Sequence, residues 1–363
     1  MKKISRKKLV VNCNDCFALY TFRLELLKEF DKLYDLSIIA RRDNYYPLLV
    51  EAGFNVIDSN VQGSKKNIFK DFKLLVFYKR IFKEINPDII INYTIKPHIY
   101  GAMASKNTIV INFVSGIGSV FLKHDFTYYI SKCLYRLIKH RVKLYIFLND
   151  DDLNVFERLK LIQNRAIIIK GEGVDLNKFH QVLNFNLPLT FIFIGRLVKE
   201  KGIEEYLQAA KIIKKINPKI RFLVAGEFYD KKTVLDKQLL LKYQAEGIIE
   251  YLGYSFNINK VLNDVHVVVL PSYREGLPIS LIEGLASKKF LIASNVVGCK
   301  DVVVDGYNGF LVEAKNVDSL VMAMMKYINY EDKELLHANA LNSSYQYDKK
   351  FYVEKMVDII ETL

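Results

Sequence analysis

The chain has 363 residues, of which 51% are hydrophobic and 26% are charged, and its formal net charge is +13. This composition excludes a disordered or fibrous protein, and the length suits two α/β domains better than one core. No apolar run approaches the ~20 residues of a membrane span, and polar residues soon interrupt the apolar stretch near the amino terminus. We therefore expect a globular protein without a membrane span or a signal peptide.

The excess positive charge is concentrated in the first half of the chain. Residues 1–175 contain 29 Lys and Arg against 18 Asp and Glu, whereas the rest contains 24 against 22. This asymmetry indicates that the first half faces an anionic partner, which could be a membrane, a nucleic acid or a phosphorylated acceptor. Nothing in the chain resembles a motif that reads DNA or RNA, so we expect no nucleic acid partner.

Strand-like and helix-like segments alternate along both halves, which predicts parallel sheets wrapped by helices. In the first half we expect helices at 20–30, 68–84 and 126–140, and strands at 9–12, 36–40, 55–57, 89–92, 109–113, 144–148 and 166–169. In the second half we expect a helix from Ile203 and strands at 191–194, 222–225, 248–252, 265–270 and 290–293.

These segments predict two doubly wound, Rossmann-like domains that face each other across a cleft. We assign 1–175 to the first domain, 176–188 to a linker, 189–345 to the second domain, and 346–363 to a helix that packs back on the first domain. Ligands bind beyond the carboxyl ends of the strands in such sheets, so residues that follow a strand directly are the first candidates for a site.

Two polar clusters allow a metal or redox interpretation and a plainer one. Cys13 and Cys16 form a CxxC pair, but no second Cys/His pair lies at zinc spacing, so two reduced thiols are favoured. Residues Asp150 to Asp152 could bind a divalent cation that grips a diphosphate. They also fall where a helix begins, where acidic residues are favoured, and we expect capping and no metal or other cofactor.

The second half contains two segments that suit a phosphorylated ligand with hydroxyl groups. A buried strand ends at Gly195 and is followed by Arg196 and Lys201, and these two cations suit two phosphates. Another strand leads into a turn with Glu275 and then into a helix, expected to begin at Pro278, that carries a second acid. The start of a helix attracts anions. Acids beside such a site cannot bind the anion themselves, so we expect them to accept hydrogen bonds from hydroxyl groups. Together these features indicate a nucleotide sugar.

The pattern Glu275-x7-Glu283, with Arg196 and Lys201 upstream, resembles the family 4 glycosyltransferases, which are retaining enzymes of the GT-B fold. The resemblance covers nearly all of 190–325 and is looser before 175. It implies that Glu283 binds the ribose hydroxyls and Glu275 the hydroxyls of the transferred sugar. It further implies that Arg196 and Lys201 bind the phosphates.

The same resemblance implies further donor contacts. The backbone N–H groups of Gly276 and Leu277 would contact the sugar and phosphate, beside Gly195 and Pro278. Tyr254 would lie near the nucleobase. The donor would be a UDP-sugar.

Segments 20–23, 91–101 and 115–121 resemble family members that extend lipid-linked oligosaccharides for surface glycans. On this basis Asn14, His98 and Gly116 are placed on the acceptor or sugar side. A surface or capping histidine with satisfied hydrogen bonds is the alternative for His98.

Two predicted helices in the basic half combine cations with aromatic residues. Basic aromatic helices suit an anionic membrane surface, although any solvated helix also has a charged face. The first basic stripe comprises Lys66, Lys70, Lys73 and Arg80, and the second comprises Lys132, Arg136, Lys139 and Lys143.

The sequence therefore predicts a retaining glycosyltransferase at the cytoplasmic face of the inner membrane. It would move a hexose or N-acetylhexosamine from a UDP-sugar to a lipid-diphosphate-linked saccharide, with Arg196, Lys201 and Glu275 as the catalytic residues. A sugar-nucleotide epimerase of similar architecture is one alternative, but the acids and histidines it would need are not evident. A non-catalytic partner subunit is another, although such subunits usually lose their charged site residues.

Overall fold

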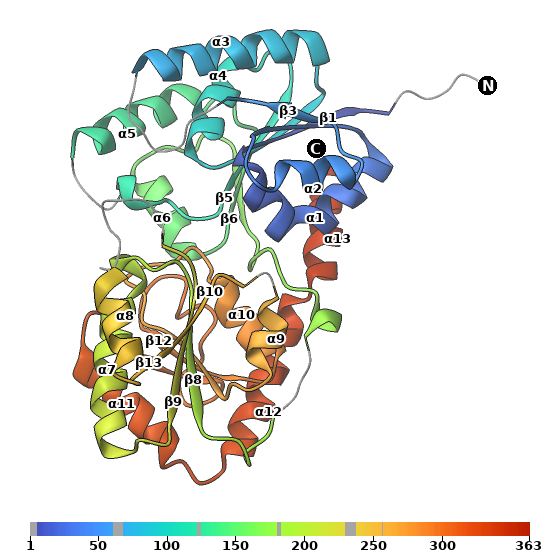
Figure 1. Ribbon diagram of the computed structural model, residues 1–363. Helices are drawn as coiled ribbons and strands as arrows, with labels where there is room; N and C mark the ends of the chain where they lie inside the picture. Colours follow the sequence, from blue (N-terminus) through green and yellow to red (C-terminus); the bar gives the residue numbers. More distant parts are fainter. Residues whose placement is uncertain (1–5, 61–67, 122–124, 180–182, 229–236, 256) are drawn as a thin grey trace. The chain divides into compact units, whose positions relative to one another are not determined.

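The computed structural model describes residues 6–60, 68–121, 125–179, 183–228, 237–255 and 257–363 (Figure 1). By their contacts the residues divide into two units, one comprising Met1–Glu172 with Val353–Leu363 and the other Gly173–Tyr352. Each unit contains one parallel sheet covered by helices, which confirms the predicted pair of doubly wound α/β domains. None of the helices built by the described residues is both long and apolar enough to cross a bilayer.

The first unit is built on a seven-stranded sheet whose strands are apolar almost throughout, because helices cover both faces. In spatial order the strands are β3 (Val56–Asp58), β2 (Asp35–Arg41), β1 (Lys8–Asp15), β4 (Ile89–Tyr93), β5 (Ile109–Val114), β6 (Leu144–Phe147) and β7 (Arg165–Ile168).

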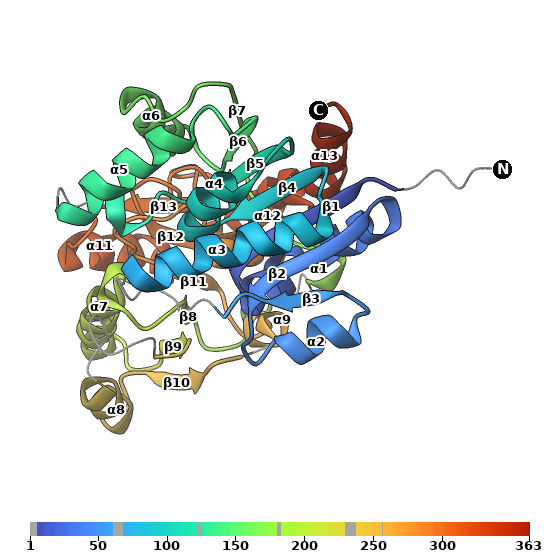
Figure 2. The same ribbon diagram turned by 90° about the horizontal axis from the view of Figure 1, so that it is seen from above.

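The direction of each crossover assigns the helices of the first unit to the two faces of the sheet. The chain moves outward one way from β1 to β3 and the other way from β4 to β7, and right-handed crossovers place the two sets of helices on opposite faces (Figures 1 and 2). One set comprises α1 (Cys16–Leu33) and α2 (Tyr46–Glu51). The other comprises α3 (Ile68–Ile85), η1 (Pro97–Gly101), α4 (Ala102–Ala104), η2 (Ser119–Phe121), α5 (Phe126–Ile138) and α6 (Asp150–Arg158).

The second unit repeats this plan with a six-stranded sheet. The spatial order is β10 (Glu250–Gly253), β9 (Arg221–Ala225), β8 (Thr190–Ile194), β11 (Val267–Leu270), β12 (Phe290–Ser294) and β13 (Gly309–Val312). The helices are η3 (Leu176–Lys178), η4 (Lys199–Lys201), α7 (Ile203–Ile216), α8 (Lys237–Ala245), α9 (Ile258–Leu262), α10 (Ile279–Ala286), α11 (Val317–Ile328), α12 (Lys333–Ser344) and η5 (Tyr345–Tyr347). The last helix, α13 (Lys349–Glu361), begins in this unit, and its residues from Val353 onward belong to the first unit.

Three details differ from the sequence prediction. The helix expected at 126–140 ends at Ile138, so Lys143 follows the helix. Pro278 is the capping residue before α10 and not its first helical residue. The edge strand β13 was not predicted, because its four residues follow a long irregular stretch and show no alternation of their own.

Candidate functional site

The strand order of the second unit fixes where a ligand should bind. The chain runs outward from β8 to β10 and then returns to place β11 on the other side of β8, so β8 and β11 are neighbours at a topological switch point. The loops that follow these two strands leave toward opposite faces and open a crevice at the carboxyl edge. The first loop carries Arg196 and Lys201, and the second carries Glu275. The structure therefore brings the predicted phosphate-binding cations and the predicted sugar-binding acid to one place.

Close backbone contact holds these two loops together. Gly202 has a φ of 74°, and a Cβ at this position would lie 2.0 Å from the carbonyl oxygen of Pro271. Only glycine fits this approach without a shift of the backbone. The backbone N–H of Tyr273 also donates to the carbonyl of Glu200 at 2.9 Å. These contacts fix the position of η4 against the Glu275 turn.

Lys201 and Glu275 form an ion pair across the two loops. The Nζ atom of Lys201 lies 2.6 Å from Oε1 and 2.7 Å from Oε2 of Glu275. Ser272, which is buried, donates its hydroxyl to Oε1 at 2.5 Å. The side chains of Lys201 and Glu275 are 18% and 10% exposed, so both charges are largely shielded from water. Sequence reasoning had placed both residues in the site but had not predicted that they pair.

A second turn supports Glu275 from the side of β12. The backbone N–H of Glu275 donates to the carbonyl of Val297 at 3.0 Å. Gly298 has a φ of 83°, and a Cβ there would lie 2.7 Å from the Cβ of Glu275. The carboxylate of Asp301 accepts from the N–H of Gly298 at 2.9 Å and fixes the turn. Sequence reasoning missed this support, although glycine and aspartate are both residue types that are common in turns.

The helix α10 begins directly after Gly276, Leu277 and Pro278. The N–H groups in the first turn of any helix lack intrahelical acceptors, so this end of α10 can bind an anion. Glu283 lies in the second turn and is half-buried. Burial raises its pKa to about 7, and the ammonium of Lys349 acts in the opposite direction. A carboxyl group with such a pKa can change its charge near neutral pH.

The other predicted donor residues lie along the same carboxyl edge. Gly195 directly follows β8, where its N–H donates to the carbonyl of Ala225 at 3.0 Å, and the exposed Arg196 comes next. Tyr254 follows β10 and is 41% exposed. Two strand spacings separate β10 from β8, a distance of about 10 Å. This span suits a nucleoside at β10 whose diphosphate reaches Arg196 and Lys201.

The predicted acceptor-side residues follow three neighbouring strands of the first unit. Asn14 lies near the end of β1, His98 in η1 after β4, and Gly116 after β5 with a φ of 148°. The switch point of this sheet lies between β1 and β4, so Asn14 stands at the edge where ligands bind. The structure gives no contact that assigns Asn14 or Gly116 to a sugar, and both remain predictions.

His98 occupies a different environment from the one expected. It is buried, with Nδ1 2.8 Å from the hydroxyl of Tyr135 and Nε2 3.0 Å from the carbonyl oxygen of Phe113. Burial lowers its pKa to about 4, so the ring is neutral at physiological pH. Both ring nitrogens are engaged inside the domain. This environment favours a structural role over contact with a sugar, and it also differs from the surface or capping alternative.

A buried asparagine ladder lies beneath the same edge. Asn12, Asn92 and Asn112 occupy matching positions on β1, β4 and β5. The side-chain amide of Asn12 donates to Asn92, and that of Asn92 donates to Asn112, each at 3.0 Å, while the hydroxyl of Tyr78 donates to Asn12 at 2.9 Å. A buried network of this kind fixes strand register, since any loss would leave polar groups unpaired.

The second basic stripe does not lie along a single helix. Lys132 lies 5.8 Å from the ring centre of Tyr128. Arg136 donates to the carbonyl of Leu159 at 3.3 and 3.1 Å. Lys139 caps the end of α5 and Lys143 lies beyond it, so the prediction of one helical stripe was wrong. In the first stripe Lys70, Lys73 and Arg80 are exposed, whereas Lys66 lies outside the described residues.

The structure shows the environments of the two clusters for which a metal or redox role was considered. Cys13 and Cys16 are buried free thiols, and burial raises their pKa values to about 11 and about 12. Asp150 to Asp152 form the first turn of α6, where the N–H of Asp152 donates to the capping Asn149 at 2.8 Å. Among the described residues there is no group of three or more His, Cys, Asp or Glu that could hold a metal ion.

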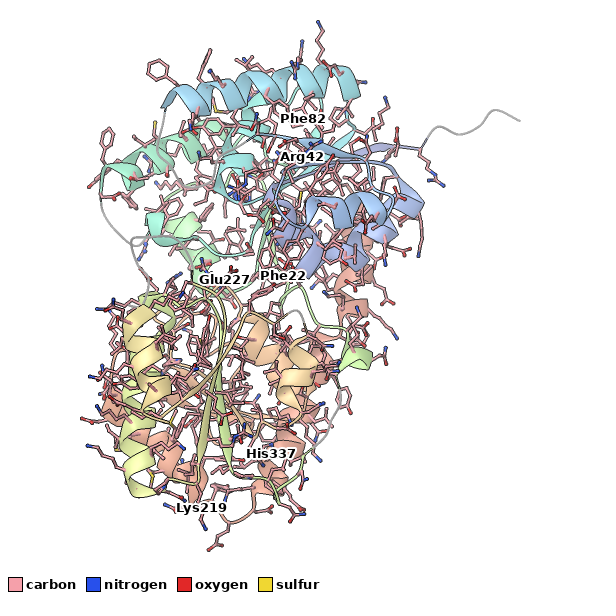
Figure 3. All side chains as sticks on the ribbon, viewed as in Figure 1. Phe22, Arg42, Phe82, Lys219, Glu227 and His337 are labelled. Atoms are coloured by element: carbon pink, nitrogen blue, oxygen red, sulfur yellow. The ribbon has the colours of Figure 1, made fainter. Side chains whose placement is uncertain are left out.

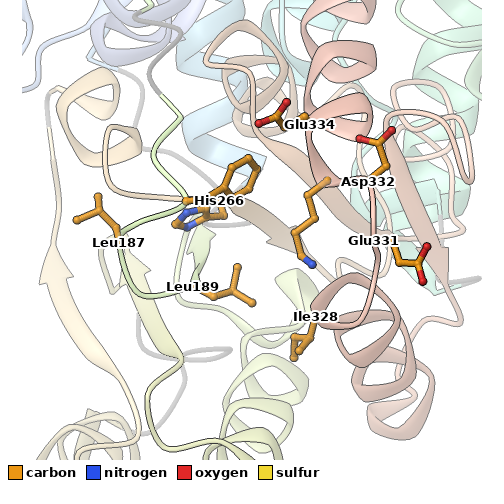
Figure 4. A pocket seen from close by; sticks show the side chains of 9 residues that line it. Leu187, Leu189, His266, Ile328, Glu331, Asp332 and Glu334 are labelled. Atoms are coloured by element: carbon orange, nitrogen blue, oxygen red, sulfur yellow. The ribbon is translucent and has the colours of Figure 1, made fainter.

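A hollow of about 760 Å³ lies at the opposite, amino-terminal edge of the second sheet (Figure 4). His266, Leu189 and Phe185 line it together with residues 331–334. His266 is held by two backbone groups, because its Nδ1 accepts from the N–H of Thr190 at 3.2 Å and its Nε2 lies 3.1 Å from the carbonyl oxygen of Asn184. This hollow is remote from the switch point, so we do not assign the donor to it.

Comparisons with known proteins agree with this geometry. A family model described as glycosyl transferases group 1 matches residues 175–342, and one described as glycosyl transferase 4-like matches residues 10–149. The chain is 25% identical to the N,N'-diacetylbacillosaminyl-diphospho-undecaprenol alpha-1,3-N-acetylgalactosaminyltransferase of Campylobacter jejuni, over 95% of this chain and 96% of the relative. It is also 25% identical to the UDP-Gal:alpha-D-GlcNAc-diphosphoundecaprenol alpha-1,3-galactosyltransferase of Escherichia coli, over 93% and 91% of the two chains.

Solved structures share the fold over almost the whole chain. Sucrose-phosphate synthase from Thermosynechococcus elongatus superposes with a TM-score of 0.79 at 16% identity, covering 98% of this chain and 99% of that one. The Anabaena protein HepE in complex with UDP gives 0.78 at 15% identity, covering 98% and 100%. At these identities the likeness shows the GT-B fold alone. Together, the two family models and the relatives matched over nearly their full length show that this chain belongs to the group 1 and 4-like glycosyltransferases and is an enzyme.

Proposed function

We propose that the enzyme transfers a hexose or an N-acetylhexosamine from a UDP-sugar to a hydroxyl of a lipid-diphosphate-linked saccharide, in the assembly of a bacterial surface polysaccharide or glycan. The observation that carries this proposal is the pairing of Lys201 with Glu275 at the switch point, beside Arg196 and the start of α10. Cations and helix N–H groups suit a diphosphate, and the adjacent acid suits sugar hydroxyls. The names of the two bacterial relatives support a lipid-diphosphate-linked acceptor, and one of them names a UDP-sugar.

The proposed chemistry places positive charge where negative charge develops. As the bond between the anomeric carbon and the phosphate oxygen stretches, charge grows on the leaving diphosphate. Arg196, Lys201 and the start of α10 are positioned to stabilise it, which lowers the barrier more than it strengthens substrate binding. A diphosphate oxygen takes the proton of the acceptor hydroxyl as the new glycosidic bond forms. Bond breaking and bond formation on the same face of the sugar give retention.

Metal independence is part of the proposal. Two cationic side chains and a helix start supply the charge that a divalent ion supplies in other transferases, and Asp150 to Asp152 lie in the first turn of α6, where acidic residues are favoured. We also propose that the protein is peripheral, at the cytoplasmic face of the inner membrane. The basic first half supports this location, because each Lys or Arg near an anionic surface contributes about 1 kcal/mol to binding.

A direct assay tests the proposal. Purified protein is incubated with a panel of UDP-sugars and with undecaprenyl-diphosphate-linked N-acetylglucosamine, with and without EDTA, and the product is examined by mass spectrometry and NMR. We expect one UDP-sugar to give an extended acceptor with a retained anomeric configuration. Inversion would refute the retaining mechanism, and a conversion of the UDP-sugar that needs no acceptor would favour an epimerase.

A further inference from the structure

The helix α5 has two apolar faces, whereas a surface helix needs one. Its inner face packs on the sheet through Tyr128, Tyr135 and Ile138. A second set of apolar residues recurs at helical spacing on the outer face, and we call it the outer stripe. Its members are Phe126, Tyr129, Ile130, Cys133 and Leu137. Phe126 is 79% exposed, Tyr129 58%, Ile130 38% and Leu137 61%. Cys133 is also exposed.

The beginning of α3 carries a similar feature. Phe69, Phe72 and Val76 follow one another at intervals of three and four residues and are 82%, 65% and 49% exposed. Single exposed apolar side chains are normal on a protein surface, but runs of them along two helices mark an interaction surface.

Both helices lie on the same face of the first sheet. They belong to crossovers that run in the same direction, and η1 packs between them, in contact with both. Figures 1 and 2 show α3 and α5 on this face, and Figure 3 shows their outer side chains extending away from the sheet. The two apolar runs are therefore parts of one side of the first unit.

The charge around the outer stripe identifies the partner. Residues 126–149 contain five Lys and Arg and neither Asp nor Glu, and the acid nearest to the outer stripe in sequence is Asp125, which caps the start of α5. In α3, Lys70 and Lys73 are exposed beside the phenylalanines. An apolar stripe bordered by cations suits the boundary between anionic headgroups and acyl chains. We infer that the outer stripe of α5, with Phe69 and Phe72 of α3, inserts into an anionic bilayer. This inference rests on the proposed membrane attachment and assigns the residues that enter the lipid.

A second copy of the chain is a poorer occupant. A symmetric dimer through this face would bring the same patch of each copy together. The cations around the outer stripe would then face cations, and like charges across an interface disfavour association. Anionic headgroups remove that repulsion.

Insertion changes how attachment should respond to salt. A purely electrostatic contact would be lost at about 1 M salt, where the Debye length is about 3 Å. Contacts between apolar side chains and acyl chains are not screened. We therefore expect part of the binding to survive high salt and to depend on the outer stripe.

The chain contains no tryptophan, so a single introduced tryptophan reports its own surroundings. The test uses the full-length variants Phe126→Trp and Leu137→Trp, with Met322→Trp on α11 as a control of similar exposure at 65%. Each is mixed with phosphatidylcholine vesicles with or without phosphatidylglycerol, and with vesicles whose acyl chains carry bromine. We expect blue-shifted emission and bromine quenching for the two α5 probes and neither effect for the control. Vesicle binding without bromine quenching of the α5 probes would overturn insertion. A blue shift that occurs without lipid and grows with protein concentration would also overturn it, because it would show that a second copy of the chain covers the outer stripe.

A second pair of variants measures the contribution of the stripe. In the triple variant Phe126→Ser, Tyr129→Ser, Leu137→Ser, we expect at least about a tenfold loss of vesicle partitioning at high salt. The control is Met322→Ser with Leu335→Ser, on helices of the second unit, and should partition like the wild type. Equal partitioning of the two variants would overturn the inference. Transfer to a short-chain, water-soluble acceptor is measured in parallel. If the wild-type protein shows no such transfer, that result counts against the proposed function and not against insertion.

Discussion

Replacing Lys201 with methionine should impair the enzyme more than replacing Arg196, although both residues are predicted to bind the same diphosphate. The reason is the carboxylate of Glu275, whose two oxygens lie 2.6 and 2.7 Å from the Lys201 ammonium. Removal of the lysine takes away a phosphate ligand and also leaves a shielded carboxylate without its cation. The unpaired charge then stands beside the site that must accept a diphosphate.

The size of the effect follows from two contributions. Loss of one preorganised donor to a charged leaving group costs about 3 kcal/mol, or roughly 10²-fold in rate. Leaving a largely buried charged group without its partner costs a further ~1–3 kcal/mol. Lys201→Met should therefore lower kcat/KM by about 10³- to 10⁴-fold, and Arg196→Met by about 10²-fold. The direct attraction at 2.7 Å is larger, about 6 kcal/mol at an effective dielectric of 20, but desolvation of both ions offsets most of it.

A double-mutant cycle measures the coupling. UDP binding is measured by calorimetry for the wild type, Lys201→Met, Glu275→Gln and the double variant, and kcat/KM is measured alongside. Glu275→Gln alone should not weaken UDP binding, because it removes a negative charge, and in the Lys201→Met background it should restore ~1–3 kcal/mol. Lys199→Met is the matched control, since this lysine in the same turn is 63% exposed. The reasoning fails if the cycle is additive within about 0.5 kcal/mol, or if Lys201→Met is no worse than Arg196→Met.

Three further predictions concern the same site. Arg196→Ala should lower turnover about 10²-fold without loss of the fold, because the side chain is exposed, and thermal unfolding with steady-state rates checks both points. With a pKa of about 7, Glu283 ionises as pH rises, so affinity for the UDP-sugar should increase between about pH 6 and about pH 8, and a Glu283→Gln variant that keeps this dependence would refute the ribose assignment. Transfer should persist in excess EDTA, whereas loss of activity that Mn²⁺ restores would reassign Asp150 to Asp152 to a metal site.

The same raised pKa has a consequence for stability with a definite sign. The folded protein holds a proton on Glu283 up to about pH 7, whereas the unfolded chain releases it near the ordinary value of 4.5. The unfolded state therefore binds fewer protons between these values, and the contribution of this group to the free energy of unfolding falls as pH rises through the window.

Much of the fold could be predicted because parallel strands covered on both faces are nearly continuous apolar runs. The segment 267–270 reads Val-Val-Val-Leu and is fully buried in β11. The start of α7 at Ile203 was likewise predictable, since Gly202 interrupts the pattern directly before it. A short edge strand was harder to predict, because the four residues of β13 pair on one side only, with β12.

The two faces of α5 show why helical periodicity does not settle which side is buried. Tyr128 and Tyr135 point inward, whereas Tyr129 on the next position is 58% exposed, and residue type does not distinguish them. The sequence drew attention to the cations of this helix because charge is easy to recognise. The apolar outer stripe became visible once the structure fixed the packed face.

The Lys201–Glu275 pair is the part of the site that sequence could not supply, and it explains how an acid can stand beside an anion site. The two residues lie 74 positions apart, and their approach depends on Gly202 and Gly298 allowing close backbone contact. In the free protein each charge stabilises the other, and both are largely shielded from water. On our proposal a bound diphosphate pairs with Lys201 in place of Glu275. The carboxylate of Glu275 then needs other hydrogen-bond donors. The hydroxyls of the donor sugar supply them, whereas a nucleoside diphosphate without the sugar does not. The acid beside the phosphates would thus favour binding of the intact donor over retention of the product, and the cycle described above measures the exchange on which this depends.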